Sequence, residues 1–184
     1  MILFAAIEIN KDARDLCETL QKSLKTQTEG SFPRRENLHV TLAYFGEVTE
    51  GTFEQIKATL DSFPAPRSSL LLSRLTAFEG RKGDHVVLLA NVDEAFKQYR
   101  ADLVEKFRQQ GIAFDPQPFR PHVTLVRAKK KNIWLDGIRF TPVVSNVDRI
   151  VLYKSFKQRG IRIYEPVYVK EAKGDDDGYK SNSV

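Results

Sequence analysis

The spacing of apolar residues along the chain alternates between a helical period and runs that are typical of strands. Leucines recur at every fourth position within 11–27, which predicts a helix there, behind an apolar strand at 2–9. Asn10, between the two, is a residue type that favours the start of a helix. The other helices are expected at 49–63 and 93–110, and the other strands at 38–45, 68–78, 85–92, 122–127, 143–153 and 161–169.

The order of these elements predicts an α+β fold. Helices are interspersed with strands, and short glycine-containing connections such as 80–84 are typical of hairpins, whose strands run antiparallel. No stretch within 1–172 has the composition of a linker, so we expect a single domain there. Residues 173–184 hold almost no apolar side chains, and we expect them to form a disordered acidic and polar tail.

Composition limits the classes of protein to which the chain can belong. Hydrophobic residues make up 41% of the 184, enough for a sizeable core, and no run approaches the ~20 apolar residues of a membrane span. Cys17 is the only cysteine, which excludes an intramolecular disulfide and a cysteine-based zinc site. The first residues lack the basic segment of a signal peptide, so we expect a cytoplasmic protein. The net charge of +5 favours polyanionic partners without identifying one.

The same tetrapeptide, His-Val-Thr-Leu, occurs twice, at 39–42 and at 122–125, each time within an expected strand. Side chains alternate between the two faces of a strand, so each copy presents an imidazole and a hydroxyl to one side. If the two strands lie together, these four polar groups converge. Two of the three histidines of the chain are placed in this way.

Two imidazoles with two hydroxyls suit a displacement at phosphorus. Histidine titrates near neutrality, so one imidazole can activate water as a base while the other protonates the departing oxygen. The hydroxyls of Thr41 and Thr124 can donate to the non-bridging phosphate oxygens, where negative charge accumulates. The pattern therefore indicates that His39 and His122 form a general acid and general base pair.

Two other interpretations of the repeat are open. A single histidine and threonine on a strand are more often core residues than catalytic ones, but a purely structural strand has no reason to repeat the pair. A two-histidine metal site would need further ligands, and neither copy has a carboxylate or a third histidine beside it. We therefore expect no metal and no other cofactor.

The repeated motif and its surroundings resemble those of the two-histidine (2H) phosphoesterases. Within that superfamily, the resemblance is to the bacterial and archaeal RNA 2′,3′-cyclic phosphodiesterases, which were first named 2′-5′ RNA ligases. It covers most of the chain. The segments that carry it are FAAIEI at 4–9, NLHVTLAYFGEV at 37–48, FRPHVTLVR at 119–127 and VLYKSFKQRGIRIYEPV at 151–167.

The resemblance implies a bilobed fold in which two mainly antiparallel sheets, related by pseudo-twofold symmetry, form a central cleft with the helices outside. It also implies a metal-independent reaction that opens 2′,3′-cyclic phosphates to 2′-phosphomonoesters. In the family pattern the first histidine, here His39, is the general acid, and the second, His122, is the general base. Arg127 matches an arginine that the family uses against the phosphate, and Thr41 and Thr124 complete the phosphate contacts.

The position of Arg127 conflicts with simple strand geometry. It stands five residues after His122, so regular alternation turns its side chain to the opposite face. The strand must therefore twist, bulge or end if Arg127 is to reach the cleft. An exposed surface arginine is the alternative.

Three further residues near the motifs have more than one interpretation. Phe45 and Phe119 can stack on a base, although aromatic residues beside strands are more often part of a core. His85 is expected to be structural, because the residue two positions later is Val87, which has no hydroxyl to offer.

The sequence as a whole predicts a monomeric enzyme that hydrolyses 2′,3′-cyclic phosphate on RNA ends or nucleotides. Two alternatives are open: the joining or cleavage of 2′-5′ RNA linkages at the same site, and the binding of RNA ends without turnover. Binding alone would be served by lysine or arginine and gains nothing from two titrating imidazoles. The pattern therefore favours an enzyme.

Overall fold

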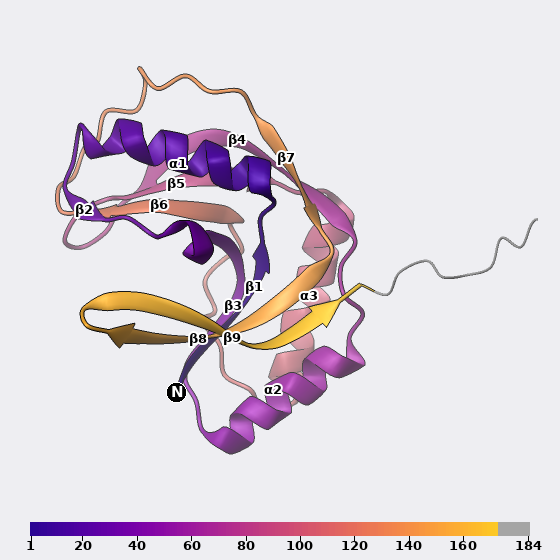
Figure 1. Cartoon of the computed structure of the whole chain (residues 1–184). Coiled ribbons are helices and arrows are strands. Elements are labelled where there is room, and N and C mark those ends of the chain that lie inside the picture. Colours follow the sequence, from indigo (N-terminus) through magenta and orange to yellow (C-terminus); the bar gives the residue numbers. More distant parts are fainter. Residues whose placement is uncertain (173–184) are drawn as a thin grey trace, which may run out of the picture.

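The computed structural model describes residues 1–172, in which nine strands form one antiparallel sheet accompanied by three α-helices (Figure 1). The helices are α1 (Lys11–Lys25), α2 (Glu50–Ser62) and α3 (Glu94–Gln109), and a 3₁₀ turn, η1, spans Arg35–Asn37. The strands are β1 (Ile2–Glu8), β2 (Gly30–Ser31), β3 (His39–Glu47), β4 (Ser68–Phe78), β5 (His85–Asn91), β6 (His122–Ala128), β7 (Val143–Val147), β8 (Arg149–Gln158) and β9 (Ile161–Glu171). The α+β class and the antiparallel pairing that the sequence predicts are confirmed.

The sheet consists of two halves that meet at a single residue pair. The strand order is β7-β4-β5-β6-β3-β1-β8-β9, and the short β2 pairs with β6. Between the central neighbours β6 and β3, only Val40 and Val123 are paired, whereas the other neighbours in this order pair over longer stretches. The two sheets implied by the family resemblance are thus joined edge to edge into one curled sheet (Figure 1). Their pseudo-twofold relation stays a prediction.

Each α-helix begins at the polar residue that the sequence places there. The side chain of Asn10 accepts a hydrogen bond from the backbone N–H three residues later at 3.0 Å, that of Thr49 at 3.2 Å and that of Asp93 at 2.7 Å. Such a cap satisfies a backbone donor that has no partner within the helix. The three predicted helix starts are therefore confirmed.

One predicted strand, 143–153, is wrong. The segment divides at Asp148 into β7, which pairs with β4 at one edge of the sheet, and β8, which pairs with β1 in the other half. The backbone carbonyl of Asp148 accepts a hydrogen bond from the N–H of Ala172 at 2.7 Å, outside both strands. Both pieces are partly buried and contain apolar residues at strand-like spacing, so the change of partner at Asp148 is not visible in the pattern.

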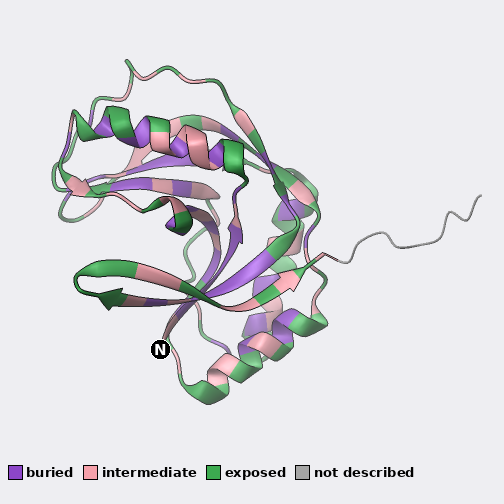
Figure 2. Ribbon diagram, viewed as in Figure 1, coloured by how far each residue is buried: buried purple, intermediate pink, exposed green. Residues whose placement is uncertain are grey.

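Apolar side chains from all three helices and from one face of the sheet form the main core. Along β3, Val40 and Leu42 are buried in this core, while His39 and Thr41, on the other face, are only half-buried. Figure 2 shows the same division on α1, where buried and exposed positions alternate around the helix. Each fully buried leucine or phenylalanine contributes about 1.5–3 kcal/mol to folding. The main core therefore lies on one face of the sheet, while the other face carries a smaller apolar cluster, formed by Phe4, Ala6, Val151 and Tyr153, beside the polar side chains of β3.

The expected disordered tail, 173–184, lies outside the described residues. Within 1–172, no helix has both the length and the apolar composition needed to cross a membrane.

Candidate active site

The two His-Val-Thr-Leu segments lie on the neighbouring strands β3 and β6, at the point where the halves of the sheet meet. Val40 and Val123 pair with each other and point into the core, so the histidine and threonine side chains on either side of them point the opposite way. All four line one cavity of about 180 Å³. The cavity is completed by Pro33, Asn37, His85, Arg127 and Tyr164.

A bulge in β6 brings Arg127 to this cavity. Thr124 and Val126 pair with consecutive residues of β5, which leaves Leu125 as an extra residue in the strand. Leu125 and Val126 are both fully buried, and Arg127 is exposed on the same face as His122. One inserted residue shifts the alternation by one position, because side chains on a strand repeat every two residues. Of the three ways in which Arg127 could reach the cleft, a twist, a bulge or the end of the strand, the structure therefore shows the bulge.

The same bulge occurs in β3, where Leu42 is the extra residue opposite β1. Consequently Tyr44 occupies the position that corresponds to Arg127, and it is 44% exposed. Phe45 is buried in the core, where its ring meets that of Phe107 edge-on at 5.0 Å between centroids. The expectation that Phe45 stacks on a base is therefore corrected: Phe45 is a core residue, and Tyr44 is the exposed ring beside the motif.

Phe119 does not line the cavity that holds the histidines. It lies in a neighbouring shallow pocket of about 110 Å³, to which Thr41 and Tyr44 also contribute. The guanidinium of Arg100 stands over its ring at 4.9 Å from the centroid, and that same side chain donates from Nε to the carbonyl of Leu42. The ring of Phe119 is thus already covered on one face by a cation.

Both histidine rings are held in the same orientation by the backbone. Nδ1 of His39 lies 2.7 Å from the carbonyl oxygen of Asn37, and Nδ1 of His122 lies 2.6 Å from that of Arg120. A carbonyl oxygen only accepts, so in each ring Nδ1–H is the donor and Nε2 is left for proton transfer. Nε2 of His39 also lies 3.1 Å from the hydroxyl of Thr41.

Burial lowers the pKa of both imidazoles. That of His39 falls to about 4, because desolvation disfavours its charged form and because Arg127 and His122 repel a positive charge there. Its ring centroid lies 4.8 Å from that of Phe4 and 5.3 Å from that of Tyr164, and these rings exclude solvent. Desolvation also lowers the pKa of His122, and Arg127 adds to this effect. Both rings are therefore mainly neutral at pH 7 in the free protein.

Sequence reasoning missed several residues of the cavity. His85, expected to be structural, pairs with Arg127 across β5 and β6 and lines the cavity. Its place at the start of a strand next to the motif strand is visible only once the pairing is known. Tyr164 comes from β9, which adjoins the site only through β8 and β1, and Asn37 comes from η1.

Other basic residues near the motifs have partners away from the cavity. Arg35 pairs with Asp15 at 2.7 Å and with Glu18 at 2.5 Å on α1. Lys129, in the basic run after Arg127, pairs with Glu29 at 3.0 Å. Across the described part of the chain, no group of three His, Cys, Asp or Glu side chains is arranged to hold a metal ion.

Comparisons with known proteins place the chain in a family. The model of the 2′-5′ RNA ligase superfamily matches residues 9–158. The chain is 28% identical to the RNA 2′,3′-cyclic phosphodiesterase of Thermotoga maritima, over 95% of this chain and 97% of that protein. It is 26% identical to the protein of the same name from Archaeoglobus fulgidus, over 88% of this chain and 87% of that protein.

Solved structures show the same fold at lower identity. E. coli LigT in complex with 3′-AMP superimposes with a TM-score of 0.77 at 21% identity, over 94% of this chain and 98% of that one. TT0787 of Thermus thermophilus superimposes with a TM-score of 0.77 at 20% identity, over 95% of this chain and 100% of that one. The family model spans most of the chain and includes both repeated motifs, so the chain belongs to the 2′-5′ RNA ligase superfamily of two-histidine phosphoesterases.

Proposed function

We propose that the protein hydrolyses 2′,3′-cyclic phosphate at RNA ends to a 2′-phosphomonoester. The observation that carries this proposal is that two oriented imidazoles, two hydroxyls and one guanidinium line a single cavity. The relatives named RNA 2′,3′-cyclic phosphodiesterases support the choice of substrate.

In the proposed reaction, His122 takes a proton from a water molecule as the water oxygen attacks phosphorus. The bond from phosphorus to the ribose 3′ oxygen breaks, and His39 gives that oxygen a proton. The product carries a 2′-phosphate and a free 3′ hydroxyl, and the second turnover begins after a proton moves from His122 back to His39 through solvent. The family pattern supports this division of roles. Thr41, Thr124 and Arg127 stabilise the charge on the non-bridging oxygens.

The lowered pKa values fit this reaction only if the substrate itself changes them. A cyclic phosphate carries a negative charge, and an anion beside an imidazole favours the protonated form. The substrate thus raises the pKa of the imidazole that must act as acid, and it also offsets the repulsion from Arg127. Protonation and substrate binding are therefore coupled in the proposed cycle.

We further propose that the reaction uses neither a metal ion nor a cofactor. The donor set supports this, because no carboxylate lines the cavity among the described residues and Arg127 is the charged group there. A divalent cation would meet a guanidinium without an anionic ligand. We also propose a cytoplasmic monomer in which residues 1–172 form a single bilobed domain.

The test is turnover of adenosine 2′,3′-cyclic phosphate in excess chelator. The wild-type protein should form adenosine 2′-phosphate at an unchanged rate after chelation. His39→Ala and His122→Ala should each lose ~10²–10⁴-fold in kcat, the usual contribution of a positioned proton-transfer group. The double variant should lose much less than the product of the two losses, because the groups act together. Binding without turnover would support an RNA-end-binding module instead.

A sulfur-substituted substrate separates the two roles. When the 3′ bridging oxygen is replaced by sulfur, the leaving thiolate needs no proton, so His39→Ala should recover ~10²-fold or more of its lost rate. His122→Ala should stay slow, since water must still be deprotonated. Rescue of His122→Ala alone would reverse the assignment of acid and base.

A further inference from the structure

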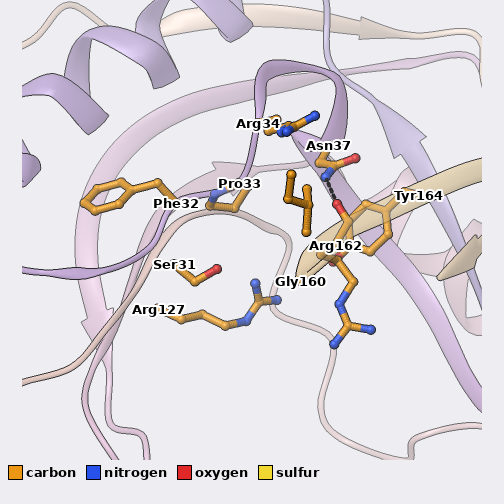
Figure 3. A pocket seen from close by; sticks show the side chains of 10 residues that line it. Ser31, Phe32, Pro33, Arg34, Asn37, Arg127, Gly160, Arg162 and Tyr164 are labelled. Atoms are coloured by element: carbon orange, nitrogen blue, oxygen red, sulfur yellow. Dashed lines mark hydrogen bonds between the residues drawn. The ribbon is translucent and has the colours of Figure 1, made fainter. Parts of the chain in front are cut away.

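Two larger cavities adjoin the one that holds the histidines, and both share Arg127 and Tyr164 with it. Their volumes are about 300 and 510 Å³. We call them together the trough; it runs between residues 31–37 and the β8–β9 hairpin. Nδ2 of Asn37 donates to the carbonyl of Arg162 at 3.0 Å, which ties the two walls together (Figure 3).

The trough is lined by positively charged side chains, of which Arg34 pairs with Glu36 at 3.7 Å. Arg34, Arg127, Lys157 and Arg162 contribute to its walls, and no Asp or Glu lines it among the described residues. Figure 3 shows Arg127 and Arg162 reaching into the trough from different strands. Within residues 1–172, neither Arg127, Lys157 nor Arg162 forms an ion pair, so these three charges are available to an anion.

The β8–β9 hairpin places two of these charges directly opposite each other. Lys157 and Arg162 are cross-strand partners, and like charges in that position destabilise a strand pair. On the other face of the same hairpin, the corresponding pair is Lys154 and Glu165, which have opposite charges. The unfavourable pair thus faces the trough and the favourable one faces away from it. A bound anion would offset the repulsion between Lys157 and Arg162.

We propose that Lys157 and Arg162 bind the phosphodiester on the 5′ side of the terminal nucleotide of an RNA whose cyclic phosphate occupies the histidine cavity. This inference rests on the proposed function and specifies its substrate class. A nucleoside 2′,3′-cyclic phosphate has no second phosphate and leaves the pair unoccupied. An oligoribonucleotide fills both sites, so the protein should select chain ends over mononucleotides.

The residues of the second phosphate site are distinct from those that surround the histidines. Lys157 and Arg162 line the trough but not the histidine cavity, and only Arg127 and Tyr164 lie at the boundary of all three cavities. Nη1 of Arg162 donates to the hydroxyl of Ser155 at 3.1 Å, which holds the guanidinium over the trough face of the hairpin. A guanidinium held in this way offers several N–H donors to a phosphate.

The experiment compares kcat/KM for adenosine 2′,3′-cyclic phosphate with that for the dinucleotide ApA ending in 2′,3′-cyclic phosphate. The wild-type protein should prefer the dinucleotide. Arg162→Gln and Lys157→Gln should each reduce that preference by ~10-fold, the usual worth of a charge-assisted hydrogen bond to phosphate. Lys154→Gln is the matched control, because it removes the same charge from the same strand on the face away from the trough. It should leave the preference unchanged.

Salt dependence gives a second readout. The logarithm of the dinucleotide kcat/KM should fall with the logarithm of salt concentration, and the slope should be shallower in Arg162→Gln and Lys157→Gln than in the wild type, because each variant has lost one charge that contacts a phosphate. Equal losses on both substrates in the trough variants would overturn the proposal, because they would mean a general effect on fold or chemistry. An unchanged preference would also overturn it.

Failure of the proposed function would be recognised separately. If the wild-type protein turns over neither substrate, affinity for a short single-stranded RNA ending in a 2′-phosphate, measured by fluorescence anisotropy, still tests the trough. Weaker binding by Arg162→Gln and Lys157→Gln, but not by Lys154→Gln, would support the second phosphate site. Equal binding by all three variants would refute it.

Discussion

At the scale of single residues, the two histidines share a backbone setting but differ in what surrounds their rings. Each donates Nδ1–H to the carbonyl two residues before it. His39 is enclosed by Phe4 and Tyr164, whereas the ring of His122 meets Phe78 edge-on at 5.1 Å between centroids. A duplicated tetrapeptide therefore yields two imidazoles with different environments. Sequence reasoning could identify the pair but not this asymmetry, because the enclosing rings come from other strands.

The pH dependence of turnover should report these lowered pKa values. Catalysis needs one neutral and one protonated imidazole, and kcat/KM reflects the free protein. Above the higher of the two pKa values the singly protonated form becomes rarer, so kcat/KM should fall with rising pH, with its descending limb below the ordinary 6.5. The ascending limb should lie near the His39 pKa of about 4.

The profile of kcat should be displaced to higher pH, because a bound phosphate favours the protonated imidazole. Both profiles can be measured on adenosine 2′,3′-cyclic phosphate at constant ionic strength, with protein stability checked at each pH. A kcat/KM that rises from pH 5 to 7 would contradict the neutral state of both rings in the free protein.

At the scale of elements, the bulges decide which side chains reach the site. The seven residues from His39 and the seven from His122 have the same sequence of buried and accessible positions, with the extra residue at Leu42 and at Leu125. Hydrophobic alternation predicted both strands but placed Arg127 on the wrong face. A bulge is a property of the pairing between two strands, so it cannot be seen in one strand alone.

The bulge in β6 predicts opposite tolerances at two adjacent positions. Val126→Thr should destabilise the protein by ~1–3 kcal/mol, because it puts a hydroxyl into the core at nearly constant volume. Arg127→Val should change the unfolding free energy by no more than ~0.5 kcal/mol, as is usual for an exposed side chain, although it removes a proposed phosphate contact. Urea unfolding measures both. In a strand without the bulge, Arg127→Val would change the unfolding free energy more than Val126→Thr.

At the scale of the whole molecule, the site depends on how the two halves of the sheet are joined. The sequence predicted the helices and most strands, because these follow from local periodicity. It did not predict the change of partner at Asp148, nor that β9 brings Tyr164 and Arg162 to the cleft, because both depend on pairing between distant segments. The same is true of the single pair that joins β3 to β6.

That joint should control catalysis more than its contribution to stability suggests. Val40 and Val123 are fully buried, pair with each other, and directly follow His39 and His122 in the chain. Val40→Ala and Val123→Ala should each cost roughly 1–3 kcal/mol in stability, the usual effect of removing buried methyl groups. Because the two histidines are positioned through this pair, kcat should also fall ~10-fold or more, as expected for a small misplacement of reacting groups.

The matched control is Val147→Ala. Val147 is also a buried valine, but it lies on β7, at the far edge of one half of the sheet. The Val147→Ala variant should lose about as much stability as Val40→Ala and Val123→Ala. Its kcat should be unchanged when all variants are assayed well below their melting temperatures. The double variant of Val40 and Val123 should show coupling in kcat, because both residues act on the same distance. If the three single variants lose kcat equally, stability alone explains the effect, and the joint does not set the spacing of the histidines.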